Sequence, residues 1–286
     1  MPTWYEKEYG VADGGWQHPY LHNARYGILL GSGSVLENEN YPAYWNDIEY
    51  LYEILDEDYN YLEEDIHLLY SVWGDEDHSG DDDRIDDEAS KDGLLRAIED
   101  ISSRITKTDF LLIAYRGHGE DTKENGEIVD GSIRLASEEN DINDDDDRPK
   151  VTHMRYSELG GHLDKLTYGR LAVIKQTCYS GSAIQHLEKE DRIIMASSKA
   201  DEESYSTYDE YYGNENGAFF FEGIKQNGGR DVYEGVVKSL GTQETPKNLL
   251  YAFEKGYEAA RNNGISEDFR STPQISGENL AEKTYL

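Results

Sequence analysis

Short apolar runs alternate along this chain with longer segments in which apolar residues recur every three or four positions. The apolar runs have the length and the aliphatic content of buried strands. We expect strands at residues 26–31, 65–70, 110–118, 171–178 and 192–196, with a short sixth at 273–276. The segments with helical spacing predict helices at residues 44–58, 90–105, 155–166, 216–226, 232–240 and 246–262.

Strands that alternate with helices predict an α/β fold with a mostly parallel sheet, covered by helices on both faces. We expect one α/β/α sandwich of about six strands over residues 25–286, since no linker divides this range. Residues 1–24 form an arm rich in aromatic residues and glycine, which we expect to pack as irregular structure. Residues 120–150 are polar, and we expect a long loop over the site with one short strand at 132–136.

Two reactive side chains follow two of the predicted strands. Cys178, the single cysteine of the chain, ends one apolar run, and His118 ends another. The carboxyl ends of strands in an open α/β sheet are where reactive groups gather. The pair therefore predicts a cysteine–histidine hydrolase. The alternative is that Cys178 is a small buried apolar residue and His118 a loop histidine.

The residues around this pair fit the chemistry of thiol attack on a carbonyl. The amides of Gly119 and Cys178 could stabilise the oxyanion, while the imidazole of His118 moves the proton. Gly181 lets the chain turn tightly after the cysteine. A helix that starts at this turn would lower the pKa of the thiol through its positive N-terminal end.

Four segments resemble, in the same order, the caspase-like clan of cysteine peptidases, which includes caspases, metacaspases, legumains and gingipains. The clan pairs a strand ending in His-Gly with a strand ending in Cys, as at residues 115–119 (YRGHG) and 176–182 (QTCYSGS) here. The Cys-x-Ser-Gly-Ser form and residues 195–205 (MASSKADEESY) are similar to legumains. Residues 272–277 are similar to a tail of bacterial and archaeal caspase-like peptidases.

This resemblance implies a caspase-like fold and an endopeptidase that cleaves after a preferred P1 residue, the residue whose carbonyl is attacked. It implies that Cys178 is the nucleophile, His118 the catalytic imidazole, and Gly119 an oxyanion donor together with the Cys178 amide. It also implies a peptide or protein substrate and no required cofactor. The positions that it assigns to substrate binding are Gln176, Ser197, Ser198, Lys199 and Asp201.

The sequence is compatible with more than one P1 residue. In the families that the chain resembles, the residue two positions before the cysteine lines the P1 pocket. It is Asp in metacaspases, Glu in legumains and Gln in caspases, and here it is Gln176. A neutral amide suits Asp or Asn at P1, with Lys199 or Arg116 helping to bind Asp. Asp201 or Glu202 could instead rebuild a site for a basic P1 residue.

The composition excludes several classes of partner. The chain has 286 residues, with 60 acidic and 27 basic side chains and a formal charge of −33. This charge repels nucleic acid and anionic membrane surfaces. Such acidity suits a salt-rich medium, so a halophilic source is one hypothesis and an ordinary source is the other.

Other features of the sequence bear on its compartment. One cysteine excludes an internal disulfide, and no apolar stretch approaches the roughly 18 residues that span a membrane. The first residues do not resemble a signal peptide. We expect a soluble protein, cytoplasmic by default, although secretion from a longer precursor is compatible with the sequence. The oligomeric state is left open.

An acidic run at residues 75–86 resembles a calcium loop of the EF-hand type. Its sixth position is glycine, but its twelfth position is Asp rather than Glu. The alternative is a solvated acidic loop. The candidate ligands are Asp75, Asp77, Ser79, Asp81 and Asp86.

Two functions compete with the peptidase. The first is a catalytically silent, caspase-like protein that binds peptides or partners, in which the pocket is blocked or the enzyme is latent. The polar segment 120–150 could be the lid that keeps the pocket blocked, or it could be a loop at which an active enzyme cuts itself. The second is a nucleotide-binding α/β domain, for which Gly31-Ser32-Gly33 would cradle a phosphate.

Overall fold

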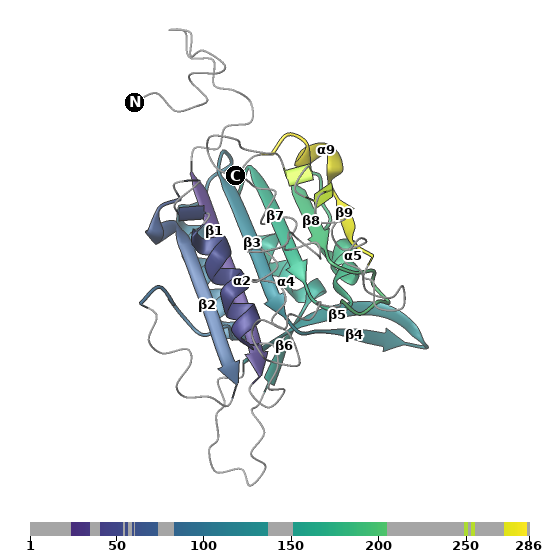
Figure 1. The fold of residues 1–286 in the computed structure, drawn as a ribbon. Helices are drawn as coiled ribbons and strands as arrows, with labels where there is room; N and C mark the ends of the chain where they lie inside the picture. Colours follow the sequence, from purple (N-terminus) through teal and green to yellow (C-terminus); the bar gives the residue numbers. More distant parts are fainter. Residues whose placement is uncertain are drawn as a thin grey trace.

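A mostly parallel sheet of six strands forms the centre of the protein in this computed structural model (Figure 1). The strand order is β2 (Ile66–Trp73), β1 (Arg25–Ser34), β3 (Phe110–Gly117), β7 (Arg170–Gln176), β8 (Arg192–Ala196) and β9 (Gln274–Ser276). Neighbouring strands are parallel except β9, which is antiparallel to β8. The structure describes residues 24–34, 41–53, 55–56, 59, 61–73, 83–136, 151–204, 249–250, 253–254 and 272–284.

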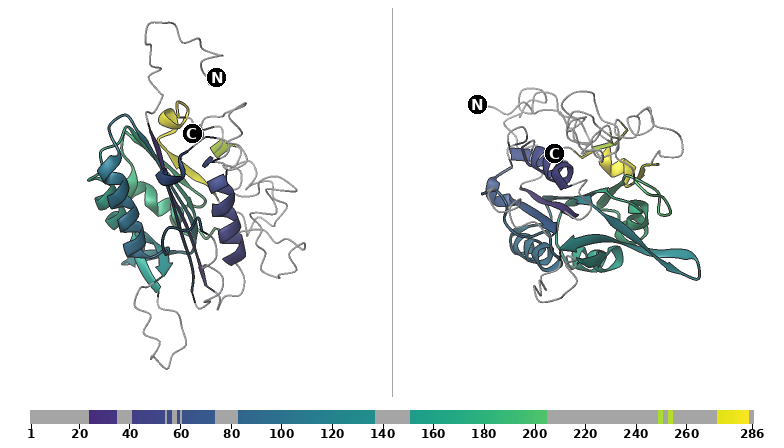
Figure 2. Two further views of the ribbon diagram at one scale, coloured as in Figure 1. Left: turned by 90° about the vertical axis from the view of Figure 1, so that its left-hand side faces the viewer. Right: turned by 60° about the horizontal axis from the view of Figure 1, so that its bottom comes forward.

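Helices cover both faces of this sheet (Figure 2). α2 (Tyr41–Glu53) packs on one face, and α3 (Lys91–Arg104) and α4 (Tyr156–Leu163) pack on the other. Successive residues of a strand point to opposite faces, so Leu112 of β3 joins the α2 side of the core and Ile113 the α3 side. The prediction of an α/β/α sandwich with about six strands is confirmed.

The strand predictions agree with the structure to within a few residues, and the helices predicted at 44–58, 90–105 and 155–166 correspond to α2, α3 and α4. The helices predicted at 216–226 and 232–240, most of the one at 246–262, and residues 1–23 of the arm lie outside the described residues. Four short helical elements complete the described part: η3 (Glu63–Asp65), η4 (Ser180–Ala183), α5 (Ile184–Leu187) and α9 (Glu278–Ala281).

The start of α3 is fixed by its capping residue. The hydroxyl of Ser90 accepts a hydrogen bond from the amide of Gly93 at 3.0 Å, which satisfies one of the amides that a helix start leaves without a partner. Leu94, Ile98 and Ile101 then form a buried stripe at helical spacing. This stripe holds α3 against β1 and β2.

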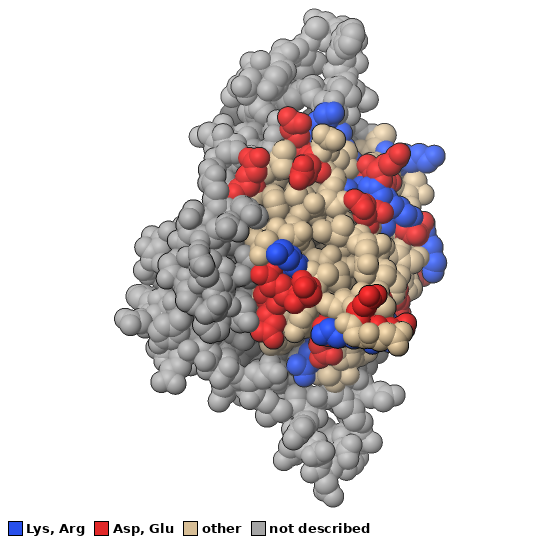
Figure 3. All heavy atoms as spheres, turned by 90° about the vertical axis from the view of Figure 1, so that its right-hand side faces the viewer, with Lys and Arg blue, Asp and Glu red and all other residues tan. Residues whose placement is uncertain are grey.

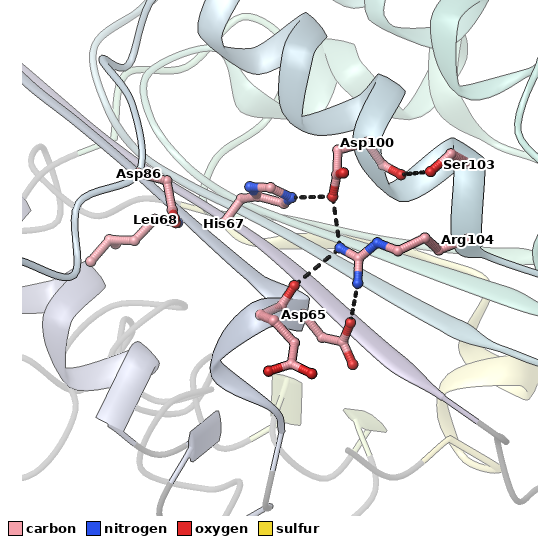
Figure 4. A network of polar contacts seen from close by, with 8 residues as sticks. Asp65, His67, Leu68, Asp86, Asp100, Ser103 and Arg104 are labelled. Carbon is pink, nitrogen blue, oxygen red and sulfur yellow. Dashed lines mark hydrogen bonds and ion pairs between the residues drawn. The ribbon is translucent and has the colours of Figure 1, made fainter.

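A polar network joins α3 to the β2 edge of the sheet (Figure 4). Asp100 of α3 accepts from Arg104 at 2.7 Å, and its carboxylate lies 3.0 Å from the imidazole of His67 on β2. Arg104 also pairs with Asp65 at the start of β2. The guanidinium of Arg104 thus ties the last turn of α3 to the strand beneath it.

A second sheet of three antiparallel strands follows His118, and it corrects one prediction. It consists of β4 (Gly119–Glu124), β5 (Glu127–Ala136) and β6 (Val151–Arg155). β4 and β5 form a hairpin that projects beyond the β9 edge of the main sheet in the view of Figure 1. The prediction of a loop was therefore wrong for residues 120–131, the strand predicted at 132–136 is present, and residues 137–150 lie outside the description.

The turn of this hairpin explains why it forms despite its polar sequence. Asn125 has φ 53° and Gly126 has φ 87°. Positive φ at both central residues is typical of the two-residue turns that match the twist of a hairpin, and Asn-Gly is their preferred sequence. The short strand predicted at 132–136 is the end of β5.

Charges of both signs are interspersed on the described part of the face beside β8 and β9 (Figure 3). Acidic and basic side chains surround an uncharged area there. Despite the net charge of −33, the described part of this face does not carry one continuous acidic patch.

Candidate active site

The two candidate catalytic residues follow two neighbouring parallel strands, β3 and β7, at the carboxyl end of the sheet. Arg116 of β3 and Gln176 of β7 are register partners, and they form the last pair of this ladder. His118 and Cys178 each stand two positions beyond that pair. Parallel pairing of two segments that lie far apart in sequence thus brings the imidazole and the thiol to one edge.

The residue after the histidine packs against the residues around the cysteine. A Cβ at Gly119 would lie 2.1 Å from Oγ1 of Thr177 and 2.4 Å from the carbonyl oxygen of Cys178. Only glycine tolerates so close an approach. The Gly119 backbone, which carries one of the two predicted oxyanion amides, therefore contacts the segment that carries the thiol.

The chain turns sharply immediately after the cysteine. Tyr179 has φ 58°, in the left-handed region that non-glycine residues seldom adopt. Its carbonyl accepts hydrogen bonds from the amide and the hydroxyl of Ser182, at 3.1 and 2.6 Å. Gly181 fits against the backbone of the segment after β8, where a Cβ would lie 2.7 Å from the Ala200 nitrogen. These contacts hold the turn in its strained conformation.

The pKa of the Cys178 thiol differs from the expectation. The sequence predicted a helix after the turn that would lower this pKa, but only the short elements η4 and α5 follow. Burial raises the pKa of the thiol, and a hydrogen bond from the Ser204 backbone opposes this effect only in part. The prediction of a lowered pKa was therefore wrong for the protein without substrate, because desolvation of the thiolate dominates.

The segment after β8 crosses directly over the thiol. The amide nitrogen of Ser204 is 3.4 Å from Cys178 Sγ, and its carbonyl oxygen is 3.7 Å away. The side chain of Gln176 donates to the hydroxyl of Ser204 at 2.9 Å. The amide of Tyr179 donates to the carbonyl of Glu202 at 2.8 Å. Residues 202–204 are therefore bound at three places to residues 176–179, which include Cys178.

The serines predicted to bind substrate make hydrogen bonds within the protein instead. Ser197 Oγ lies 3.2 Å from both the amide nitrogen and the carbonyl oxygen of Thr177. Ser198 Oγ accepts from the amide of Ser180 at 3.2 Å. Both serines are buried. They join the end of β8 to the turn after β7.

The charged candidates in this segment have different surroundings. Lys199 and Asp201 are exposed. The carboxylate of Glu202 accepts hydrogen bonds from the amide of Lys199 at 3.0 Å and from the amide of Thr272 at 2.8 Å. It also accepts from the Thr272 hydroxyl at 3.0 Å. Glu202 therefore ties this segment to the residues just before β9.

A buried ion pair lies beside Gln176. Arg116 Nε is 2.8 Å from Oδ2 of Asp47, and both side chains are almost fully buried. The guanidinium of Arg116 lies 4.5 Å from the ring centroid of Tyr44, and this ring meets His118 edge-on with centroids 5.7 Å apart. α2 therefore supplies two side chains to the surroundings of the site.

Sequence reasoning did not identify Tyr44 or Asp47 as part of the site. The sequence did contain a signal for Asp47, since this acidic residue directly precedes Ile48, which lies on the apolar stripe of the predicted helix. A charged residue on a buried helix face needs a partner of opposite charge. The sequence alone does not say that this partner is Arg116.

The predicted calcium ligands fall largely outside the description. Asp75, Asp77, Ser79 and Asp81 are not among the described residues. Asp86 is described, and its carboxylate accepts from the amide of Leu68 at 2.8 Å. In the described ranges, no cluster of three or more His, Cys, Asp or Glu side chains is arranged to hold a metal. Calcium binding stays a prediction.

No helix in the described part of the chain is both long and apolar enough to cross a membrane.

Comparison with known proteins finds a family model that matches part of the chain and a solved structure with a similar fold. Residues 147–224, which include β7 and Cys178, match the model of the Peptidase C13 family. No match was found among curated proteins. Caspase-1 from Spodoptera frugiperda is 13% identical, with 90% of this chain and 88% of that chain covered and a TM-score of 0.51. Protein GSU0716 from Geobacter sulfurreducens is 14% identical, with 88% and 92% covered and a TM-score of 0.48. The likeness to caspase-1 shows a caspase-like fold.

Proposed function

We propose that the chain is a cysteine peptidase of the caspase-like clan, an endopeptidase whose nucleophile is Cys178 and whose catalytic imidazole is His118. The match of residues 147–224 to the Peptidase C13 model and the caspase-like fold support this proposal. The observation that carries this proposal is the pairing of β3 with β7. Their parallel register brings the His-Gly and Cys segments to one sheet edge, with Gly119 packed against Cys178. Its substrates are peptides or proteins.

The proposed reaction follows from the groups at this edge. His118 takes the proton of the Cys178 thiol, the resulting thiolate attacks the carbonyl carbon of the scissile bond, and the amides of Gly119 and Cys178 donate to the oxyanion. His118 gives a proton to the leaving amine, so the peptide bond breaks and an acyl-enzyme forms. Water, activated by the same imidazole, then releases the acid and the free thiol.

The charge balance near Gln176 supports Asn as the P1 residue. The Arg116 charge is balanced by Asp47, so the pocket that we propose has no net charge there. A basic P1 side chain needs a negatively charged partner, and neither the balanced Arg116–Asp47 pair nor the neutral Gln176 supplies a net negative charge. The alternative of a basic-P1 site built by Glu202 is not supported, because its carboxylate binds Lys199 and Thr272 backbone amides.

Hydrogen bonding separates Asn from Asp as the P1 residue. Gln176 is 1% exposed, and its side-chain oxygen has no hydrogen-bond partner among the described residues. A buried acceptor without a donor costs roughly 1–3 kcal/mol. The side-chain amide of a P1 Asn can donate to this oxygen, whereas the carboxylate of Asp cannot. We therefore propose Asn at P1, ahead of Asp.

A panel of fluorogenic peptides that differ only at P1 tests this function. The wild-type protein is assayed beside Cys178→Ala and His118→Ala, with calcium and with a chelator, at low and high salt. We expect cleavage after Asn that both substitutions abolish. Cleavage that survives in Cys178→Ala overturns the proposed nucleophile. The absence of cleavage under all conditions favours the catalytically silent, peptide-binding alternative.

Self-processing is tested separately by intact-mass analysis. We propose that the active enzyme cuts its own chain, and that Cys178→Ala does not. A shorter mass in the wild type alone supports this proposal. Equal, full-length masses in both proteins, while the wild type cleaves peptides, exclude it.

A further inference from the structure

The hydroxyl of Tyr115 lies directly beneath the turn that carries His118. Tyr115 is 1% exposed, three residues before the histidine on β3. Its Oη is 3.0 Å from the carbonyl oxygen of His118 and 2.7 Å from that of Arg134 on β5. One phenol proton is therefore placed between two backbone acceptors, one of them on the histidine itself.

The same carbonyl of His118 receives a second hydrogen bond. The amide of Arg134 donates to it at 3.1 Å. The chain between Tyr115 and His118 is closely packed, since a Cβ at Gly117 would lie 2.5 Å from Tyr115 Oη. The main chain of the histidine is thus held from one side by the β5 strand and from below by the phenol.

The ring of Tyr115 is itself in contact with the buried amine of Lys175. Lys175 of β7 is the register partner of Tyr115. Its Nζ lies 5.3 Å from the ring centroid of Tyr115 and 4.2 Å from that of Tyr156. Burial lowers the pKa of this amine well below its usual range. Lys175 stands three residues before Cys178, so this contact links the histidine strand to the cysteine strand.

We propose that Tyr115 is a positioning residue, whose hydroxyl fixes the backbone of His118 and so aligns the imidazole with the thiol. This inference rests on the proposed role of His118. A displacement of about 1 Å in a catalytic group can reduce a rate roughly 100-fold. Loss of one of the two hydrogen bonds at the His118 carbonyl leaves the turn partly held, so the effect is smaller than removal of the imidazole.

The test is Tyr115→Phe, with Tyr61→Phe as the matched control. Tyr61 is also buried, and its hydroxyl has no hydrogen-bond partner among the described residues. We expect Tyr115→Phe to lower kcat by roughly tenfold, within the range that misalignment produces, while KM changes little. We expect Tyr61→Phe to retain the kcat of the wild type. A kcat for Tyr115→Phe equal to that of the control overturns the proposal.

A second readout separates positioning from general damage to the site. The rate of iodoacetamide alkylation of Cys178, measured at the high-pH plateau of its pH profile, reports on the thiolate without the histidine. We expect this rate to be unchanged in Tyr115→Phe. A parallel loss of alkylation and kcat means that the whole site is disturbed, and it also overturns the proposal.

The result for Tyr115 is distinguishable from a failure of the proposed function. If His118→Ala keeps its activity, the catalytic role of His118 is wrong, whatever Tyr115→Phe does. If His118→Ala is inactive and Tyr115→Phe behaves like the Tyr61→Phe control, only the positioning role is wrong.

Discussion

The backbone of Ser204 lies across the thiol of Cys178, with its amide nitrogen 3.4 Å and its carbonyl oxygen 3.7 Å from Sγ. Glu202, two residues earlier, is bound on one side by Tyr179 and on the other by Thr272. The segment over the thiol is therefore anchored to the turn after Cys178 and to Thr272, two residues before β9. It keeps the thiol partly buried in the protein without substrate.

Slow alkylation of the thiol is the first prediction. Because burial raises the pKa of Cys178, we expect the rate of alkylation by iodoacetamide to reach half its maximum at a pH above about 8.5, the ordinary cysteine value. The chain has one cysteine, so incorporation measured by mass spectrometry reports on this site alone. Cys178→Ala is the control and takes up no label. A midpoint at or below the ordinary value contradicts the prediction.

Gln176→Glu tests hydrogen bonding to the P1 residue. A carboxylate at this position accepts but does not donate, so it binds the amide of a P1 Asn and repels a P1 Asp. We expect the ratio of kcat/KM for Asn over Asp peptides to rise by at least about tenfold, equivalent to roughly 1.4 kcal/mol. Gln185→Glu adds the same charge at an exposed position. An unchanged ratio would show that Gln176 does not contact the P1 side chain.

Asp47→Asn tests the charge balance of the Arg116 pair. Breaking a buried ion pair leaves one charge uncompensated and costs about 3–5 kcal/mol. We expect a lower Tm and, because Arg116 is no longer neutralised, a shift of P1 preference toward Asp. The matched control is Asp92→Asn, since Asp92 is exposed at the start of α3. Lower stability without a shift in P1 preference would show that the ion pair stabilises the fold but does not influence the selection of the P1 residue.

The Arg104 network predicts a stability effect that depends on pH. The hydrogen bond from Arg104 is the largest cause that holds the pKa of Asp100 below its usual value. A carboxyl group with a lowered folded-state pKa stabilises the fold above its unfolded pKa of about 3.9. This contribution is lost as the pH falls through the folded-state value.

Arg104→Met should therefore lower Tm at pH 7 and have a smaller effect under acid conditions. The residues are partly exposed, so solvent screening limits the loss to about 1 kcal/mol, or a few degrees. Thermal unfolding of the variant and the wild type is compared at pH 7 and near pH 3. Lys107→Met, at an exposed position just beyond α3, is the control. An equal difference at both pH values would contradict this account.

The sequence predicted the parts of the fold that rest on uninterrupted burial. β3 and β7 are buried almost throughout, and each contains an uninterrupted apolar run, at residues 110–115 and 171–174, so their positions and the side chains that follow them could be inferred. The β4–β5 hairpin was missed because β4 is polar and mostly exposed to solvent. Its Asn125-Gly126 turn was the informative signal.

The rest of the site depends on how distant segments cross. The contact of Ser204 with Cys178 is set by the path of the chain after β8, and the contact of Tyr44 with His118 by the packing of α2. Neither the path nor the packing angle is encoded in a local pattern. The same applies to Tyr115, whose strand position was predicted but whose hydroxyl contacts depend on β5.

The strand order also determines when the site can assemble during folding. The strand β3 precedes the three strands of the second sheet in the sequence, and its partner β7 follows them. β3 can therefore pair with β7 only after the ribosome has synthesised those strands, and Ser204 is synthesised later still. Pairings between such distant segments form slowly, because loop closure must precede them. An emerging chain on the ribosome therefore carries the histidine, and later the thiol, before the complete site exists. If the proposed function is right, synthesis from the N-terminus delays cleavage until β7 and the residues up to Ser204 have been made.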